Sequence, residues 1–148
     1  MTNEETISVL NDLIQVSKDG EREFHDCAEE VTDPELLKFF TETSQRCAEG
    51  VTMLQEEVRR LGGDPETEGS FSGAAHRMWT NLKTVVAGAD KGSILQECER
   101  GEQHAVEAYE KALQEDLPTD IRAMVKMQHH GVVANRDRVH TLLQQQMQ

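Results

Sequence analysis

The chain has 148 residues, of which 36% are hydrophobic, 4% aromatic and 29% charged. This length is typical of one domain, so residues 1–148 are expected to form a single unit with a sizeable core. The few aromatic residues disfavour a β-sandwich and fit long amphipathic helices that each bury one apolar stripe. With 28 acidic residues against 15 basic ones, the net charge is −13, and such a surface repels phosphate groups. We therefore expect no nucleic-acid partner and no membrane partner.

Two further features predict a cytoplasmic protein. No apolar run approaches the roughly 20 residues that span a bilayer, and no basic segment precedes the first apolar residues, as a secretory signal requires. The three cysteines are Cys27, Cys47 and Cys98, and their spacing is not that of a metal site. A small and odd number of cysteines favours reduced thiols, which are typical of the cytoplasm.

The first half of the chain is predicted to form two antiparallel helices. Residues 3–31 carry apolar side chains at alternating intervals of three and four, the period of a helix that packs in a bundle. Residues 34–61 repeat this pattern, with a stripe made of Leu37, Phe40, Ser44, Cys47, Val51, Leu54, Val58 and Leu61. Asp33 is suited to cap the second helix, and Pro34 is suited to its first position. A connection this short makes the two helices antiparallel neighbours.

The second half begins with a linker and then returns to helical periodicity. Residues 62–73 are rich in glycine and polar side chains, and a short amphipathic helix is predicted at residues 73–86, with Trp79 as its packing anchor. Ser93 opens a Ser-Ile-Leu-Gln capping box, which predicts the start of the third long helix. A Leu-Pro pair ends that helix, and the fourth covers residues 118–146.

This order of elements predicts an all-α, antiparallel four-helix bundle. Two helical hairpins are joined by about 30 residues, which is long enough to travel the length of a bundle. The second hairpin is then expected to dock after one long crossover that carries the short extra helix, which is the ferritin-like topology.

Polar residues interrupt the apolar stripes at similar depths. Glu21 lies near the middle of the first predicted helix, and Glu102 lies near the middle of the third, one turn after Glu99. Arg46 is near the middle of the second helix, and Gln128 is near the middle of the fourth. Mid-helix residues meet at mid-depth in an antiparallel bundle, so Glu21 and Glu102 are expected to face each other inside the protein.

Buried carboxylates need compensation, because an isolated buried charge costs several kcal/mol. A metal ion, a buried cation such as Arg46, or a raised pKa with a shared proton would each provide it. The sequence does not choose among these three. A plain alternative is that a slight rotation of either helix exposes its glutamate, since acidic residues are abundant in this chain.

Several runs of sequence resemble a bacterial ferritin-like family of unknown function. They are LNDLIQVSKDGEREFHDCAEEVTDPELLKFF, QRCAEG, VRRLGGDP, ECERGEQHAVEAYEKALQEDLP and IRAMVKMQHHGVVANRDRV. The resemblance covers nearly the whole chain, about residues 5–143. It implies the bundle fold and a distant kinship to di-iron carboxylate proteins, and it implies no established activity.

The resemblance also suggests which residues correspond to metal ligands. Di-iron proteins of this fold use one Glu on each of two helices and Glu-x-x-His on the other two. Glu21 matches the first single glutamate, and Glu102 or Glu99 matches the second. The other two helices carry Ser-Gln-Arg-Cys at residues 44–47 and Gln-His-His-Gly at residues 128–131, where the family pattern has Glu-x-x-His. The metal hypothesis is therefore iron or manganese held by Glu21, Glu102, Glu99 and Gln128, with few ligands for a tight di-iron centre.

Two functional hypotheses follow, with a weaker third. The first is a non-enzymatic bundle that acts through assembly, as a homo-oligomer such as a dimer, or through a protein partner, with the polar layer fixing helix register. The alternative is a metal-binding ferritin-like oxidoreductase or storage protein that uses iron or manganese. The third is a small-ligand cavity lined by Cys47, Gly50, Gly101 and Tyr109.

Overall fold

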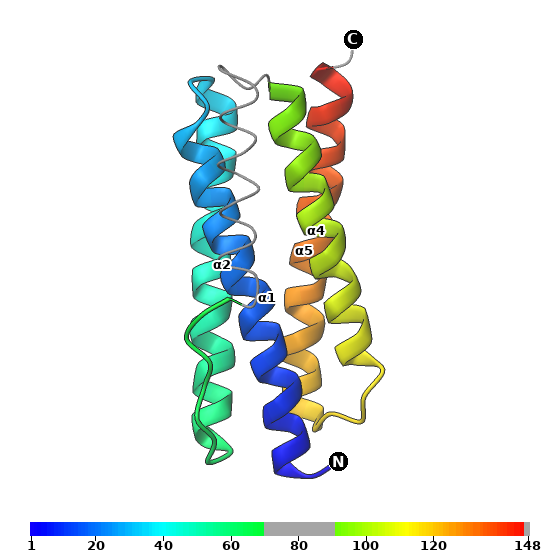
Figure 1. Cartoon of the computed structure of the whole chain (residues 1–148). Helices are drawn as coiled ribbons and strands as arrows, with labels where there is room; N and C mark the ends of the chain where they lie inside the picture. The colour runs from blue at the N-terminus through cyan, green and yellow to red at the C-terminus, as the bar shows by residue number, and fades with distance from the viewer. Residues whose placement is uncertain (70–90, 147–148) are drawn as a thin grey trace.

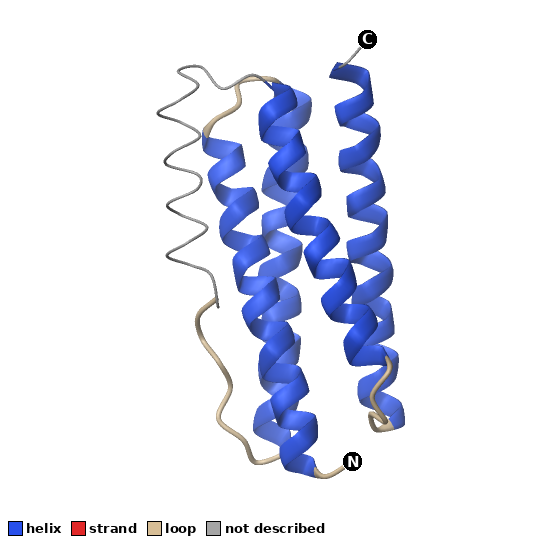
Figure 2. Cartoon of the chain, turned by 45° about the vertical axis from the view of Figure 1, so that its right-hand side comes forward, coloured by secondary structure: helices blue, strands red, loops and turns tan. Residues whose placement is uncertain are grey.

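The described part of the chain forms four long helices, which run antiparallel to their neighbours in a bundle (Figure 1). The computed structural model describes residues 1–69 and 91–146. The helices are α1 (Asn3–Glu29), α2 (Pro34–Arg60), α4 (Lys91–Leu113) and α5 (Thr119–Gln146). No strand occurs within the described ranges, as Figure 2 also shows. The predicted all-α four-helix bundle is thereby confirmed.

The connections give the bundle its ferritin-like order. The first hairpin, α1 and α2, ends at the opposite end of the bundle from the point where α4 begins (Figure 1). The second hairpin, α4 and α5, then packs on the first mainly through α1 and α4, whereas α2 and α5 make the least contact. The predicted short helix at residues 73–86, with Trp79, lies outside the described residues.

Local signals explain where the helices begin and end. The Asp33 side chain accepts hydrogen bonds from the backbone N–H groups of Glu35 (2.9 Å) and Leu36 (3.3 Å), which caps α2 as predicted. Gly62 follows α2 with a φ of 85°, a left-handed conformation that suits glycine. The predicted start at Ser93 was wrong, because α4 already begins at Lys91 and Ser93 lies inside its first turn.

The core consists of two apolar clusters separated along the bundle axis. The first lies around the first half of α1 and contains Leu10, Leu13, Ile14, Val51, Leu54, Val58, Tyr109, Ala112, Leu117, Ile121 and Val125. The second lies around the second half of α1 and contains Phe24, Cys27, Leu36, Phe40, Ile94, Leu95, Cys98, Val139, Leu142 and Leu143. Buried polar residues of all four helices lie between these clusters: Ser17, Thr43, Glu102 and Asn135.

The apolar stripe of α2 is rotated slightly from its predicted position. Leu36 is buried whereas the predicted core residue Leu37 is 42% exposed, and Thr43 is buried in place of Ser44. The prediction of Leu37 as a core residue was therefore wrong. None of the described helices is long and apolar enough to cross a membrane.

Candidate functional site: a polar layer and an open groove

Asn135 of α5 is the centre of the buried polar layer. Its Oδ1 accepts hydrogen bonds from Thr43 Oγ1 and from Arg46 Nη2, both at 3.0 Å. Its Nδ2 donates to Glu102 Oε2, also at 3.0 Å. This single amide therefore connects α2, α4 and α5 at mid-depth.

Glu102 is the buried carboxyl group of this layer, with only 5% of its surface exposed. Burial raises the pKa of Glu102 to about 7, although the hydrogen bond from Asn135 and the charge of Arg46 act in the opposite direction. A large share of molecules therefore carry a neutral, protonated Glu102 at neutral pH. The predicted partner Arg46 reaches the layer through Asn135 and acts on Glu102 through space.

A second tier of hydrogen bonds lies one level along the bundle, around Tyr109 of α4. The Tyr109 hydroxyl donates to Gln128 Oε1 at 2.8 Å and accepts from Ser17 Oγ at 3.0 Å. Gln128 Nε2 donates to the backbone carbonyl of Gly50 at 3.3 Å. The predicted site residue Gln128 thus links α5 to α2 and α4, and burial raises the pKa of Tyr109.

Glu21 does not join this network. Its side chain is 31% exposed and pairs with Lys18 on the same helix, at 3.5 Å between Nζ and Oε2. It lines a surface depression between α1 and α2 together with Ser44, and Glu102 does not line that depression. Glu21 Oε2 is nevertheless buried and has no hydrogen bond within the described structure. The expected face-to-face arrangement of Glu21 and Glu102 is therefore not what the structure shows.

Glu23, which the sequence analysis missed, is the acidic residue of α1 that lies against α4. Its carboxylate packs so closely on Gly101 that a Cβ atom there would overlap Glu23 Oε2. Burial raises the pKa of Glu23 well above its ordinary value, and the charges of Glu97 and Glu102 add to this effect. The unusual mid-helix glycine of α4 is the sequence signal that indicates this contact.

Glu99, one turn before Glu102, lies at the outer edge between α4 and α5. Its Oε1 is 2.9 Å from Nδ1 of His140, and both side chains are partly exposed. Of the four predicted ligands, the structure therefore connects Glu102 and Gln128 to the buried layer and leaves Glu99 and Glu21 outside it. Their joint role in binding a metal remains a prediction.

Charged side chains of three helices act on the thiol of Cys47. Burial, with smaller contributions from the charges of Glu102, Glu21 and Glu23, raises the pKa of Cys47 to about 12, and Arg46 acts in the opposite direction. The Cys47 sulfur also packs close to Gly20 of α1. This thiol is therefore protonated at neutral pH.

A groove opens over the polar layer on the side where α2 and α5 make little contact. Its cavity has a volume of about 240 Å³, and its lining includes Glu102, Asn135 and Tyr109. Met53 and Met127 lie at this groove, and they are 37% and 56% exposed, which is unusual for large apolar side chains. We call this feature the α2–α5 groove. It includes Cys47, Gly50 and Tyr109 of the cavity that the sequence suggested, but not Gly101, which Glu23 covers.

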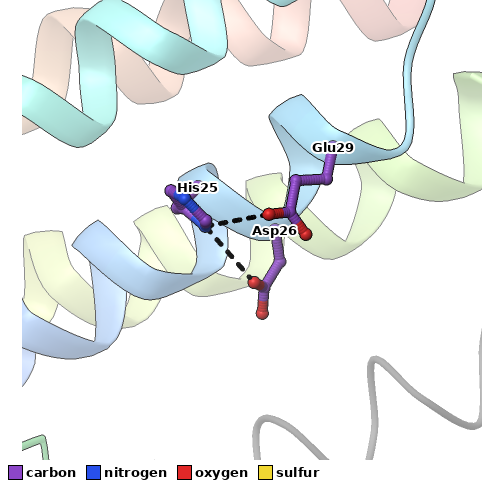
Figure 3. A group of neighbouring side chains, drawn as sticks. All are labelled: His25, Asp26 and Glu29. Atoms are coloured by element: carbon purple, nitrogen blue, oxygen red, sulfur yellow. Dashed lines mark ion pairs between the residues drawn. The ribbon is translucent and has the colours of Figure 1, made fainter.

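A different group of ligand types lies on the surface of α1. His25 Nδ1 is 3.7 Å from Asp26 Oδ1 and 3.8 Å from Glu29 Oε1, as Figure 3 shows. Among residues 1–69 and 91–146, this is the single group of three or more His, Cys, Asp or Glu side chains close enough to share a metal ion. The residues at the centre of the bundle therefore do not fit a di-iron carboxylate centre.

Comparisons with known proteins place the chain in a family. Residues 5–115 match the family described as Domain of unknown function (DUF2383). A solved structure of a mutant of Dps1 from Mycobacterium smegmatis is similar, with a TM-score of 0.78 and 14% identity over 95% of this chain and 96% of that chain. At this identity the similarity shows the fold alone, and no curated protein matches. The chain therefore belongs to the family Domain of unknown function (DUF2383), and its fold is ferritin-like.

Proposed function

We propose that this protein is a non-enzymatic bundle that works as a homodimer formed through the α2–α5 groove. The observation that carries this proposal is the pair of exposed methionines at a groove whose polar floor is already hydrogen-bonded within the chain. The polar layer then fixes the arrangement of the helices. Met53 and Met127, which we call the apolar rim of the groove, form the contact between the subunits.

The hydrogen bonds of the layer support a structural role for it. Asn135 uses both its oxygen and its nitrogen, and Tyr109 uses its hydroxyl as donor and acceptor. These bonds connect all four helices, so a slip of one helix along another would leave buried polar groups unpaired. The layer therefore specifies one register of the bundle, a role that buried polar groups have in other helical assemblies.

The composition of the rim supports a second copy of this chain as the partner. Methionine side chains adapt to a partner surface because they are unbranched and flexible. Arg46 and Glu49 also lie at the groove, one turn apart on α2. In a two-fold symmetric dimer, Arg46 of one subunit faces Glu49 of the other, and the same pair forms a second time across the axis. A self-complementary surface requires such pairing.

Sedimentation velocity at about 0.15 M salt, which screens the repulsion between two acidic chains, tests this proposal. We expect the wild type to sediment as a dimer and the double variant Met53→Glu, Met127→Glu to sediment as a monomer with unchanged helical content. The matched control is Leu37→Glu, which places a charge on an exposed apolar side chain of α2 that does not line the groove. A monomeric wild type, or an equal effect of the control, contradicts the proposal.

Metal binding is the second candidate, with iron or manganese as the ion. The surface group of His25, Asp26 and Glu29 favours it, as does the buried Oε2 of Glu21, which has no hydrogen bond within the described residues. The similarity to the Dps1 structure adds only the fold. Metal analysis after anaerobic loading with ferrous or manganous ions tests this candidate.

Two variants separate the possible locations of such an ion. If the wild type binds stoichiometric metal and the double variant Glu21→Gln, Glu102→Gln does not, the ion lies at the centre of the bundle. Metal that is lost in His25→Ala and kept in the first variant places it at the surface group on α1. Absence of stoichiometric metal from the wild type removes this candidate.

A further inference from the structure

Two cysteines of different hairpins meet in the core. Cys27 of α1 and Cys98 of α4 are 71 positions apart in the sequence, yet their sulfur atoms lie 3.0 Å from each other. Both are fully buried, and both are free thiols. Helices α1 and α4 form the main contact between the hairpins, so this sulfur pair lies directly on the seam.

The surroundings keep the pair aligned. The two cysteines belong to the second apolar cluster, where Phe24, Leu95 and Val139 are also fully buried. Such packing restricts the rotamers of both side chains. A disulfide has an S–S length of about 2.05 Å, so the two sulfur atoms need to approach by only about 1 Å.

We propose that Cys27 and Cys98 form a reversible disulfide that locks the two hairpins together under oxidising conditions. The co-reactant is hydrogen peroxide or a small organic disulfide. With peroxide, one sulfur attacks an oxygen atom, the O–O bond breaks, and a sulfenic acid and one water form. The second sulfur then attacks the sulfenic sulfur, so that the S–S bond forms, the S–O bond breaks and a second water leaves. In total, the two thiols lose two electrons and two protons, and one peroxide is reduced to two waters.

Burial determines the rate and the selectivity of this reaction. The pKa of Cys27 and that of Cys98 are both raised by burial, so few thiolates are present in the closed bundle. The oxidant reaches them when the seam between α1 and α4 opens, or before the hairpins dock during folding. Cys47 lies on α2, away from this pair. Within the described residues, its sulfur has no contact with the sulfur of another cysteine.

Intact mass spectrometry after alkylation of free thiols in denaturant tests the proposal. The Cys47→Ser variant is treated with hydrogen peroxide while folded, and in a second arm it is refolded from denaturant with oxidised and reduced glutathione. We expect a product that has lost about 2 Da and takes up no alkylating agent, because both remaining thiols are paired. Peptide mapping should join the segment around Cys27 to that around Cys98, and dithiothreitol should restore both thiols.

Thermal unfolding of the same samples tests the effect on the fold. A bond that closes a loop of this length limits the unfolded chain, so the oxidised protein should melt on the order of 10 °C higher than the reduced protein. The controls Cys27→Ala and Cys98→Ala should show no such shift. Two alkylated thiols in both arms overturn the proposal, and so does an oxidised protein that melts below the reduced one.

Discussion

The two apolar clusters and the polar layer between them stabilise this bundle in different ways. The clusters bury large side chains such as Phe24 and Leu54, whose contribution follows the apolar area removed from water. The layer holds Glu102, Asn135 and Thr43, whose bonds replace bonds to water and add little net free energy. The ends of the core therefore supply stability, whereas the centre selects the register and makes stability depend on pH.

The largest effect is expected in the cluster that contains Phe24. Phe24→Ala should lower the free energy of unfolding by about 3–5 kcal/mol, because it leaves a cavity among tightly packed side chains. Phe39, which packs edge-on against Phe24 and is only partly buried, is the matched control, and Phe39→Ala should cost clearly less. Urea unfolding monitored by circular dichroism measures both. Equal losses would contradict the assignment of Phe24 to the core.

The next effect concerns Glu102 and appears only as a pH dependence. Its pKa in the folded state is about 7, above the ordinary value of 4.5, so the folded protein binds the proton more tightly than the unfolded chain. Proton binding at Glu102 therefore stabilises the fold fully below about pH 4.5. This contribution to the free energy of unfolding, about 3 kcal/mol in total, is lost as the pH rises through 7. Glu102→Gln should show a shallower decline in the free energy of unfolding between pH 5 and pH 8.

The control for this comparison is Glu99→Gln, which changes a partly exposed carboxylate one turn away. Its pH profile should follow that of the wild type. The residual slope of Glu102→Gln should come from Glu23, whose pKa is also raised by burial. Parallel profiles for all three proteins would contradict the raised pKa of the buried Glu102.

A smaller effect is expected in the second tier of the layer. Tyr109→Phe keeps the ring and removes the hydroxyl that bonds Ser17 and Gln128. We expect a loss of about 1–2 kcal/mol in the free energy of unfolding, because two buried polar side chains lose a partner. Chemical denaturation measures this loss. An unchanged stability would mean that water satisfies both groups through the α2–α5 groove.

The smallest effects compare two helical glycines. Gly131 has no atom within 4 Å of the position of an added Cβ, so Gly131→Ala should raise the free energy of unfolding by up to about 1 kcal/mol. Gly101→Ala gains the same helix propensity but must displace the carboxylate of Glu23. It should therefore be less favourable than Gly131→Ala in the same denaturation assay. A larger gain at Gly101 would contradict the close packing of Glu23.

Much of the fold could be predicted from periodicity and caps. Asp33 and Pro34 mark the start of α2, and the spacing of apolar residues locates all four long helices to within a few residues. The error at Leu37 shows what periodicity leaves open. Adjacent residues lie about 100° apart around a helix, so a small rotation exchanges Leu36 for Leu37 at the core.

The site was predictable only in part, for the same reason. Glu102 continues an apolar stripe of α4 closely enough that its burial was foreseen, and the structure buries it. On α1, Glu21 lies four residues after the buried Ser17 and three before the buried Phe24, so its spacing continues the stripe although its side chain is 31% exposed. The packing of α4 against α1 brings Glu23 inward instead, and interhelical packing is not encoded in the period of one helix.

The ionisation of Glu102 is the most direct test of the claim that the centre of the bundle is a hydrogen-bonded layer formed by its own side chains. Its carboxyl carbon can be followed by NMR during a pH titration of metal-free and manganese- or iron-treated protein, with Glu102→Gln to assign the signal. We expect a pKa of about 7 for Glu102 in both samples. A pKa at or below the ordinary 4.5, or one that falls when metal is added, would contradict it.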